Sequence, residues 1–139
     1  MADLKYEEES YRIRGSIFEV YREMGCGFLE AVYQECLAIE LLRQGIEFEA
    51  QKPIRLAYQG HPLRQTYVAD FVCYGRIILE IKALRAIAPE HRAQVINYVR
   101  STNLKLGLLV NFGATPRVEI ERFALSHSAT SAFSAVNSS

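Results

Sequence analysis

The sequence predicts an α/β fold, and three observations support this. Apolar residues recur at helical spacing over the first 45 residues, β-rich segments bounded by glycine and proline follow, and a further helical segment precedes two more apolar strands. Half of the 139 residues are hydrophobic, which is enough for one hydrophobic core. We therefore expect a single domain over residues 1–125, followed by a flexible Ser- and Ala-rich tail over residues 126–139.

Three helices are predicted, over residues 8–24, 28–44 and 89–100. Gly25 and Gly45 follow the first two, because glycine readily adopts the left-handed conformation that ends many helices. Pro89 suits the first turn of the third. We expect the buried stripes to be Tyr11, Ile13, Ile17, Phe18 and Val20 in the first helix, Leu29, Val32, Cys36, Ile39 and Leu42 in the second, and Val95, Ile96 and Val99 in the third.

Strands are predicted over residues 48–58, 65–73, 76–82, 105–111 and 118–125. Pro53 indicates that the first of them lies at a sheet edge or in a hairpin, because proline cannot donate a hydrogen bond to a central ladder. Residues 59–62 form the predicted turn after it. Tyr74 and Gly75 are the predicted connection of a hairpin between the second and third strands.

Charge and cysteine content exclude several classes of protein. Sixteen basic residues balance sixteen acidic ones, so any contact with nucleic acid must come from local clusters of charge. Cys26, Cys36 and Cys73 show no CxxC or Cys/His spacing, which favours reduced thiols in the cytoplasm over disulfides or a zinc knuckle. The acidic N-terminus is unlike a secretory signal, and no apolar run is long enough to span a membrane. We expect a cytoplasmic protein with no membrane partner.

Charged residues stand in the hairpin where core strands are usually apolar. Side chains alternate between the faces of a strand, so Glu80 and Lys82 point the same way. If the hairpin folds about Gly75, the numbers of facing residues sum to 150, and Asp70 lies opposite Glu80 with Cβ atoms ~5 Å apart. Two carboxylates and an amine are then expected to converge.

A divalent cation would resolve the repulsion between these two carboxylates. Both faces of the hairpin are otherwise apolar, so one carboxylate would have to take up a proton unless a cation joined Asp70 and Glu80. Mg²⁺ favours carboxylate oxygen and keeps several water molecules for a phosphate. Lys82 could orient or deprotonate the attacking water. The alternative is that all three residues lie in water at the strand end and form surface ion pairs.

Further motifs carry a resemblance to a known family. Residues 27–33 read GxxExxY, and they are accompanied by Tyr-x-Ala-Asp ending at Asp70, by Leu-Glu-Ile-Lys, by Ala-Gln-x-x-Asn-Tyr at 93–98 and by Gly-Leu-Leu-Val-Asn-Phe-Gly at 107–113. From about residue 11 to 125 the chain resembles the bacterial GxxExxY proteins, which are grouped with the PD-(D/E)xK nucleases. One departure is Cys26, which stands where such proteins have Pro between two glycines.

This resemblance implies a restriction-endonuclease-like αβββαβ core with a mixed central β-sheet flanked by helices. It also implies that Asp70, Glu80 and the Ile81 carbonyl bind Mg²⁺ or Mn²⁺ and that Lys82 assists the nucleophilic water. Glu30 corresponds to the extra acidic residue that some of these nucleases use near the metal. From the residues alone, Glu30 is equally a solvated glutamate of a helix.

Gln94 and Tyr98 are four residues apart and share one helix face. They resemble the QxxxY element of related exonucleases, which lies beside the active site and positions substrate or the lysine. Without the resemblance, Tyr98 is a core aromatic. Tyr33 could bond a carboxylate or simply pack.

Other candidates could contact substrate phosphate. His91 is one, although a lone histidine in the first turn of a helix is more often polar surface. Arg92 is another, with Arg85 and Arg100, because a guanidinium suits phosphate. Asn111 and Gly113 are expected to fix a turn.

These residues predict a metal-dependent nuclease, with DNA as the expected substrate. The alternatives are a catalytically inert nuclease-fold binding module and a hydrolase of another phosphate ester. DNA or RNA, and chain ends or internal bonds, are compatible with the same residues. A homodimer or a partner protein could deliver the substrate.

Overall fold

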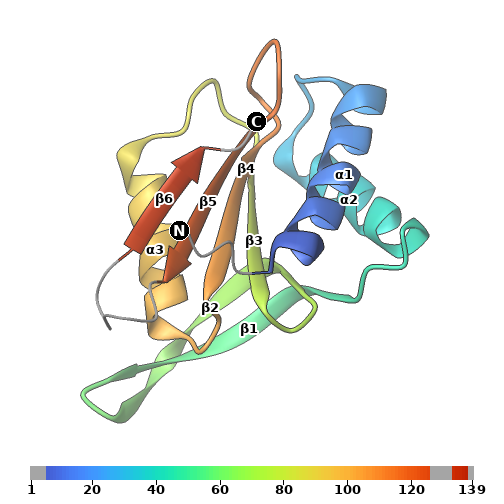
Figure 1. Cartoon of the computed structure of the whole chain (residues 1–139). Helices are drawn as coiled ribbons and strands as arrows, with labels where there is room; N and C mark the ends of the chain where they lie inside the picture. The colour runs from blue at the N-terminus through green and yellow to red at the C-terminus, as the bar shows by residue number, and fades with distance from the viewer. Residues whose placement is uncertain (1–5, 126–132, 138–139) are drawn as a thin grey trace.

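The computed structural model describes residues 6–125 and 133–137 (Figure 1). The elements follow in the order α1 (Glu7–Met24), α2 (Glu30–Arg43), β1 (Phe48–Tyr58), β2 (His61–Cys73), β3 (Ile77–Lys82), α3 (Pro89–Ser101), β4 (Leu106–Asn111), β5 (Glu119–Leu125) and β6 (Phe133–Asn137). No helix in this described part of the chain has the length and apolar character needed to cross a membrane.

The strands form one mixed sheet in the order β1-β2-β3-β4-β5-β6. Among the described strands only β3 and β4 pair in parallel, and α3 is the crossover that joins them. Figure 1 shows α1 and α2 on one side of the sheet and α3 on the other. The predicted fold class, a mixed sheet flanked by helices, is therefore confirmed.

A hydrophobic cluster lies on each face of the sheet. Ile13, Leu37 and Phe112 belong to the larger cluster, between the sheet and the helix pair α1 and α2. Val95 and Val99 of α3 belong to the smaller cluster, which covers the opposite face. The cluster to which a residue of β2 or β3 belongs therefore shows which face of the sheet its side chain covers.

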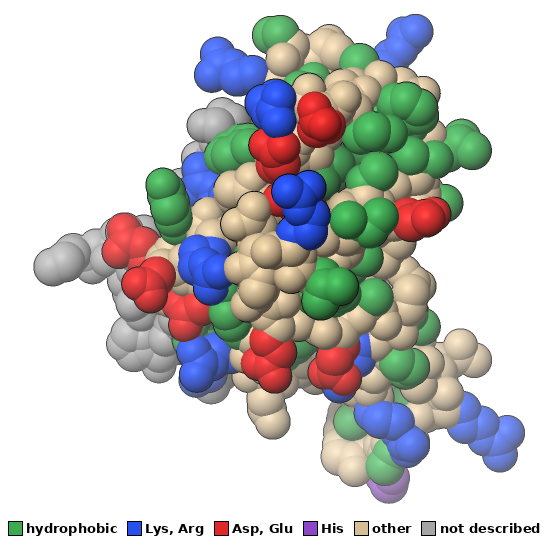
Figure 2. All heavy atoms as spheres, turned by 90° about the vertical axis from the view of Figure 1, so that its right-hand side faces the viewer, with side chains coloured by type: hydrophobic (Ala, Val, Ile, Leu, Met, Phe, Trp, Pro, Cys, Tyr) green, Lys and Arg blue, Asp and Glu red, His purple; other side chains and the backbone are tan. Residues whose placement is uncertain are grey.

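The structure corrects parts of the predicted helix stripes. On α1, Ile13, Ile17 and Val20 are buried as expected, but Tyr11 and Phe18 are exposed. On α2 the stripe was wrong, because Leu29, Ile39 and Leu42 are exposed and the helix buries Tyr33, Leu37, Glu40 and Leu41 instead. Both rows on α2 have helical spacing, so the sequence pattern did not decide which one packs. The exposed apolar side chains of the helix pair contribute to the hydrophobic surface in Figure 2.

The two edges of the sheet also differ from expectation. Strand β2 begins at His61 rather than at residue 65, so the β1–β2 hairpin is longer than predicted. Within the expected tail, Phe133–Asn137 forms β6, which pairs with β5 and satisfies its otherwise open edge. Residues 126–132 and 138–139 lie outside the described part of the chain.

The predicted register of the β2–β3 hairpin is confirmed where the strands pair. The partners are Phe71↔Leu79, Val72↔Ile78 and Cys73↔Ile77, each pair summing to 150. Side chains along β2, however, do not alternate regularly between the two faces of the sheet, because the pattern changes at Asp70. Ala69 packs in the α3-side cluster and Phe71 in the opposite one, which two residues on one regular strand would not do. Beside this point, Gln51 of β1 has a left-handed backbone with φ of 52°.

Candidate active site

Asp70 lies where the β2–β3 ladder opens. The last paired residues are Phe71 and Leu79, and one step further the Asp70 carboxylate takes the place of the missing backbone acceptor. Its Oδ2 accepts a hydrogen bond from the Ile81 amide at 2.8 Å. Because residues on either side of Asp70 point to opposite faces, its side chain lies between the strands rather than on a face. We call this opening the β2–β3 fork.

Glu80 is the most buried carboxylate of the fork, with 8% of its surface exposed. Its Oε2 accepts hydrogen bonds from the Tyr67 hydroxyl and, at 3.3 Å, from the Asp70 amide. Burial, and then the charge of Asp70, raise the pKa of Glu80 to about 7, against the lowering effects of these hydrogen bonds and of Lys82. The two predicted carboxylates therefore converge and repel each other.

Ile81 presents its backbone to the fork. Its amide bonds Asp70, whereas the carbonyl of its neighbour Lys82 accepts from Phe112 on the β4 side. The N–H and C=O of one strand residue point to the same side, so the Ile81 carbonyl also faces the fork. This is the arrangement that a carbonyl ligand would need.

Lys82 and Glu30 complete the charges around the fork. Glu30 begins α2, and burial raises the pKa of its carboxyl, with Asp70 raising it further and Lys82 lowering it. Lys82 is half-buried at the end of β3 and also acts on Glu80. Glu30 and Lys82 thus lie within electrostatic range of the fork, where Asp70 and Glu80 meet.

Tyr67 joins this group, and the sequence analysis missed it. Its hydroxyl donates to Glu80, and its ring stacks on Tyr98 of α3 with centroids 3.4 Å apart and planes at 11°. Burial and the neighbouring Glu80 raise the pKa of Tyr67, so its hydroxyl keeps its proton. Regular alternation placed Tyr67 on the other face from Glu80, and only the change at Asp70 brings the two together.

Gln94 and Tyr98 share a face of α3, as predicted from their spacing. The Gln94 amide lies 3.5 Å from the Tyr98 hydroxyl. A row of contacting side chains therefore leads from the exposed surface of α3 to the fork, in the order Gln94, Tyr98, Tyr67 and Glu80. Gln94 itself is exposed.

Two further residues, Gln34 and Asn111, hold the fork in place. Gln34, one turn after Glu30 on α2, donates to the Asp70 carbonyl at 3.2 Å; its position four residues from Glu30 was the available signal. Asn111 is fully buried and bonds both the amide and the carbonyl of Leu84, just after Lys82. A Cβ on Gly113 would lie 2.3 Å from the Leu84 carbonyl oxygen. Asn111 and Gly113 thus fix the segment that follows β3 as well as their own turn.

Tyr33 packs in the core, which is one of the two roles expected for it. Its side chain is fully buried and stacks on Phe112, with centroids 4.6 Å apart. The hydroxyl donates to the Gly25 carbonyl at 2.5 Å and accepts from the Phe28 amide. Tyr33 therefore fixes the turn between α1 and α2.

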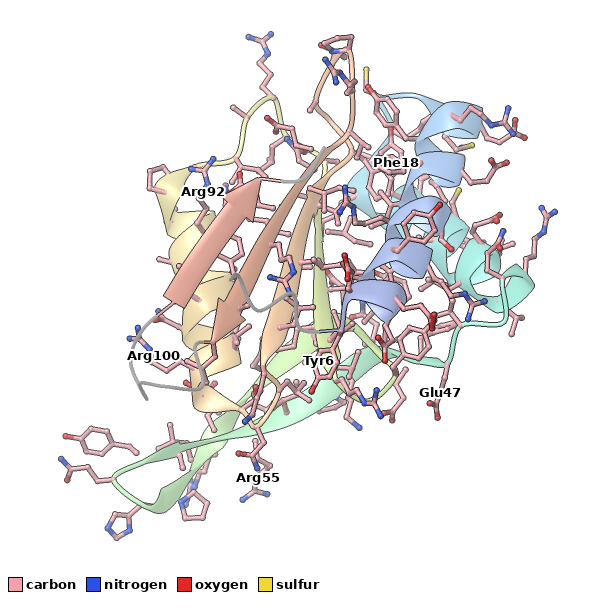
Figure 3. All side chains as sticks on the ribbon, in the orientation of Figure 1. Tyr6, Phe18, Glu47, Arg55, Arg92 and Arg100 are labelled. Carbon is pink, nitrogen blue, oxygen red and sulfur yellow. The ribbon has the colours of Figure 1, made fainter. Side chains whose placement is uncertain are left out.

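His91 and Arg92 both make contacts within the protein. The His91 Nδ1 atom accepts from the Ala88 amide at 2.9 Å and caps the start of α3. Arg92, near the upper end of α3 in Figure 3, is held by Glu121 through Nε and a second nitrogen, at 2.7 and 2.9 Å. Arg85 and Arg100 remain exposed.

The donor set fits a hard divalent cation. In the described part of the chain no hydrogen bond engages Asp70 Oδ1 or Glu80 Oε1, so each carboxylate keeps one oxygen for a cation. No cluster of three or more His, Cys, Asp or Glu suited to a metal occurs among the described residues. Two carboxylates and one carbonyl, completed by water, are a typical set for Mg²⁺.

The fork lies outside one prominent surface hollow. That hollow, of about 380 Å³, lies between β1 and the segment after α3 and includes none of Asp70, Glu80 and Lys82.

Comparison with known proteins places this arrangement in a family. The model of the PD-(D/E)XK nuclease superfamily matches residues 7–123, which include every residue of the fork. Searches of curated proteins and of solved structures each gave no match.

Proposed function

Since the chain belongs to the PD-(D/E)XK nuclease superfamily, we propose that it is a metal-dependent nuclease that hydrolyses phosphodiester bonds, with DNA as substrate. One observation carries the proposal: Asp70 and Glu80 converge at the β2–β3 fork, beside Lys82. The GxxExxY motif at residues 27–33 further supports membership of the bacterial GxxExxY group.

Asp70, Glu80 and the Ile81 carbonyl would hold Mg²⁺ or Mn²⁺. Such an ion, when bound, acts as a Lewis acid that stabilises negative charge on the phosphorus centre under attack. Lys82 orients the attacking water through Nζ, and Glu30 accepts a hydrogen bond from water on the α2 side of the fork.

Tyr67, Tyr98 and Gln94 are positioning residues in this proposal. The Tyr67 hydroxyl holds Glu80 Oε2, and the Tyr98 ring holds Tyr67 by stacking. Supporting bonds of this kind keep metal-binding carboxylates oriented. Gln94, the exposed member of this row of contacting side chains, would contact the substrate strand.

The test is cleavage of single- and double-stranded DNA and RNA with Mn²⁺ or Mg²⁺. Wild-type protein should cleave DNA, and Lys82→Ala should lose about 100-fold or more of the rate, because the attacking water is no longer held. Lys105→Ala is the matched control, since Lys105 is an exposed lysine outside the fork. Circular dichroism checks that both variants fold.

The outcomes separate the candidate functions. Equal cleavage by wild type and Lys82→Ala would identify a contaminating nuclease. Metal and DNA binding without cleavage would favour the inert binding module, and turnover of small phosphate esters alone would favour the other hydrolase. For location we propose the cytoplasm, supported by the three free cysteines Cys26, Cys36 and Cys73.

A further inference from the structure

The β1–β2 hairpin extends past the body of the protein. Figure 1 shows it reaching beyond the rest of the sheet, and we call residues 55–66 the arm. Ile54 and Leu56 still pack against the α3-side cluster, but every residue from 57 to 66 is exposed. The arm therefore adds no core of its own, and its exposed side chains are available to a partner.

The arm carries positive charge without compensation. No Asp or Glu occurs between Glu49 and Asp70, although the whole chain is neutral. Arg55 and Arg64 are exposed and make no ion pair with any described residue, whereas Lys52, at the base of the hairpin, is bound to Glu49 at 2.9 Å. In Figure 3, Arg55 points away from the ribbon, and in Figure 2 the protrusion at the lower right shows basic and histidine colours but no acidic colour. This local cluster favours a polyanionic partner.

The backbone of the hairpin is poorly suited to adding a strand from another protein. β1 is an edge strand of the sheet, and Pro53 removes a donor from it. The register shifts between Arg55 and Ala57, which twists the arm, and Pro62 lies opposite Ala57. The side chains of the arm are thus its means of recognition, and they include Tyr58, which is 65% exposed.

The distance from the arm to the fork can be compared with the length of a nucleic-acid duplex. β2 runs without interruption from Arg64 to Asp70, and six residues of strand span ~20 Å. Along a nucleic-acid duplex this equals about six base pairs at ~3.4 Å each. We propose that the arm binds the phosphate backbone of duplex DNA about six base pairs from the bond cleaved at the fork, an inference that rests on the proposed nuclease function.

The experiment compares DNA binding with and without the two arginines. Arg55→Ala/Arg64→Ala is combined with Lys82→Ala, so that binding is measured in Mg²⁺ without cleavage. The matched control is Arg22→Ala/Arg117→Ala, which removes two positive charges from a surface hollow beside α1. Probes are a 30-base-pair duplex, an 8-base-pair duplex and a 30-nucleotide single strand.

The expected result is a Kd for the long duplex at least about tenfold weaker in the arm variant, with the control within twofold of its parent. The slope of log K against log salt should fall by about 1.8, because each lost phosphate contact contributes about 0.9. The 8-base-pair duplex cannot reach the arm when centred on the fork, so its affinity should not change. With Lys82 restored, the arm variant should show a raised KM and an unchanged kcat.

An unchanged Kd and salt slope on the long duplex would overturn the inference. A loss seen only on the single strand would overturn its duplex part. If gel filtration showed that the arm variant dissociates a dimer, the arm would be a protein interface instead. Arm-dependent binding of the long duplex by a protein that never cleaves would refute the nuclease proposal but support duplex binding by the arm, so the two failures are distinguishable.

Discussion

Glu80 illustrates how single residues of the fork constrain one another. A buried carboxylate beside another carboxylate is costly, and the raised pKa of Glu80 records that cost. Tyr67 offsets part of it by donating to Oε2, and Tyr98 fixes the Tyr67 ring. We therefore expect the Tyr67 hydroxyl to fix the orientation of the Glu80 carboxylate, in addition to the packing of the Tyr67 ring in the core.

Tyr67→Phe should weaken Mg²⁺ binding by about tenfold or more, because the orientation of Glu80 is lost while the stacked ring stays in place. Titration calorimetry with Mg²⁺ or Mn²⁺ measures this. Tyr98→Phe is the control, because it keeps the stack and removes a hydroxyl whose one hydrogen bond among the described residues is with Gln94, at 3.5 Å. Equal metal affinities in wild type and Tyr67→Phe would show that Glu80 does not need the Tyr67 hydroxyl to bind the ion.

At the scale of elements, α2 connects the GxxExxY motif to the fork. Glu30 faces the charges of the fork and Gln34 donates to the Asp70 carbonyl, whereas Tyr33 turns into the core. The glutamate and the tyrosine of the motif thus have different tasks. One contributes charge at the site, and the other anchors the helix that presents it.

Tyr33→Phe should lower the free energy of unfolding by about 1–3 kcal/mol, because the half-buried Gly25 carbonyl loses its donor. Urea denaturation measures this change. Metal affinity per folded molecule should stay within about twofold of wild type, since Tyr33 touches none of the carboxylates. A loss of metal binding with unchanged stability would instead assign Tyr33 to the site.

At the scale of the whole molecule, metal binding should couple to stability. The proposed ligands come from β2 and β3 at the point where these strands separate, so a bound cation would join the two strands. A ligand at about 100 times its Kd stabilises the folded state by about 2.7 kcal/mol. For a chain of this size that is a rise in Tm of roughly 10 °C.

Thermal unfolding with and without Mn²⁺ tests this coupling. Wild type should show the rise in Tm, and Asp70→Asn should lose most of it, because one of two carboxylate ligands is gone. Glu47→Gln, an exposed carboxylate outside the fork, should behave as wild type. A rise of the same size in Asp70→Asn would mean that the cation binds elsewhere.

The sequence by itself determined the order of the elements from α1 to β5, the register of the β2–β3 hairpin and the prediction that Asp70 and Glu80 come close together. These follow from local periodicity and turn residues, and the register pairs that sum to 150 bear this out. The pairing of Gln94 with Tyr98 followed from helical spacing in the same way.

Only the tertiary structure decided which row of α2 is buried, where His91 and Arg92 are engaged, and that Tyr67 supports Glu80. The change of alternation at Asp70 lies beside Gln51 of the neighbouring strand β1, which adopts a left-handed backbone. Regular alternation describes an isolated strand, whereas contacts between elements distant in the sequence set the irregular positions. The fork is such a position, because a carboxylate replaces a backbone partner there.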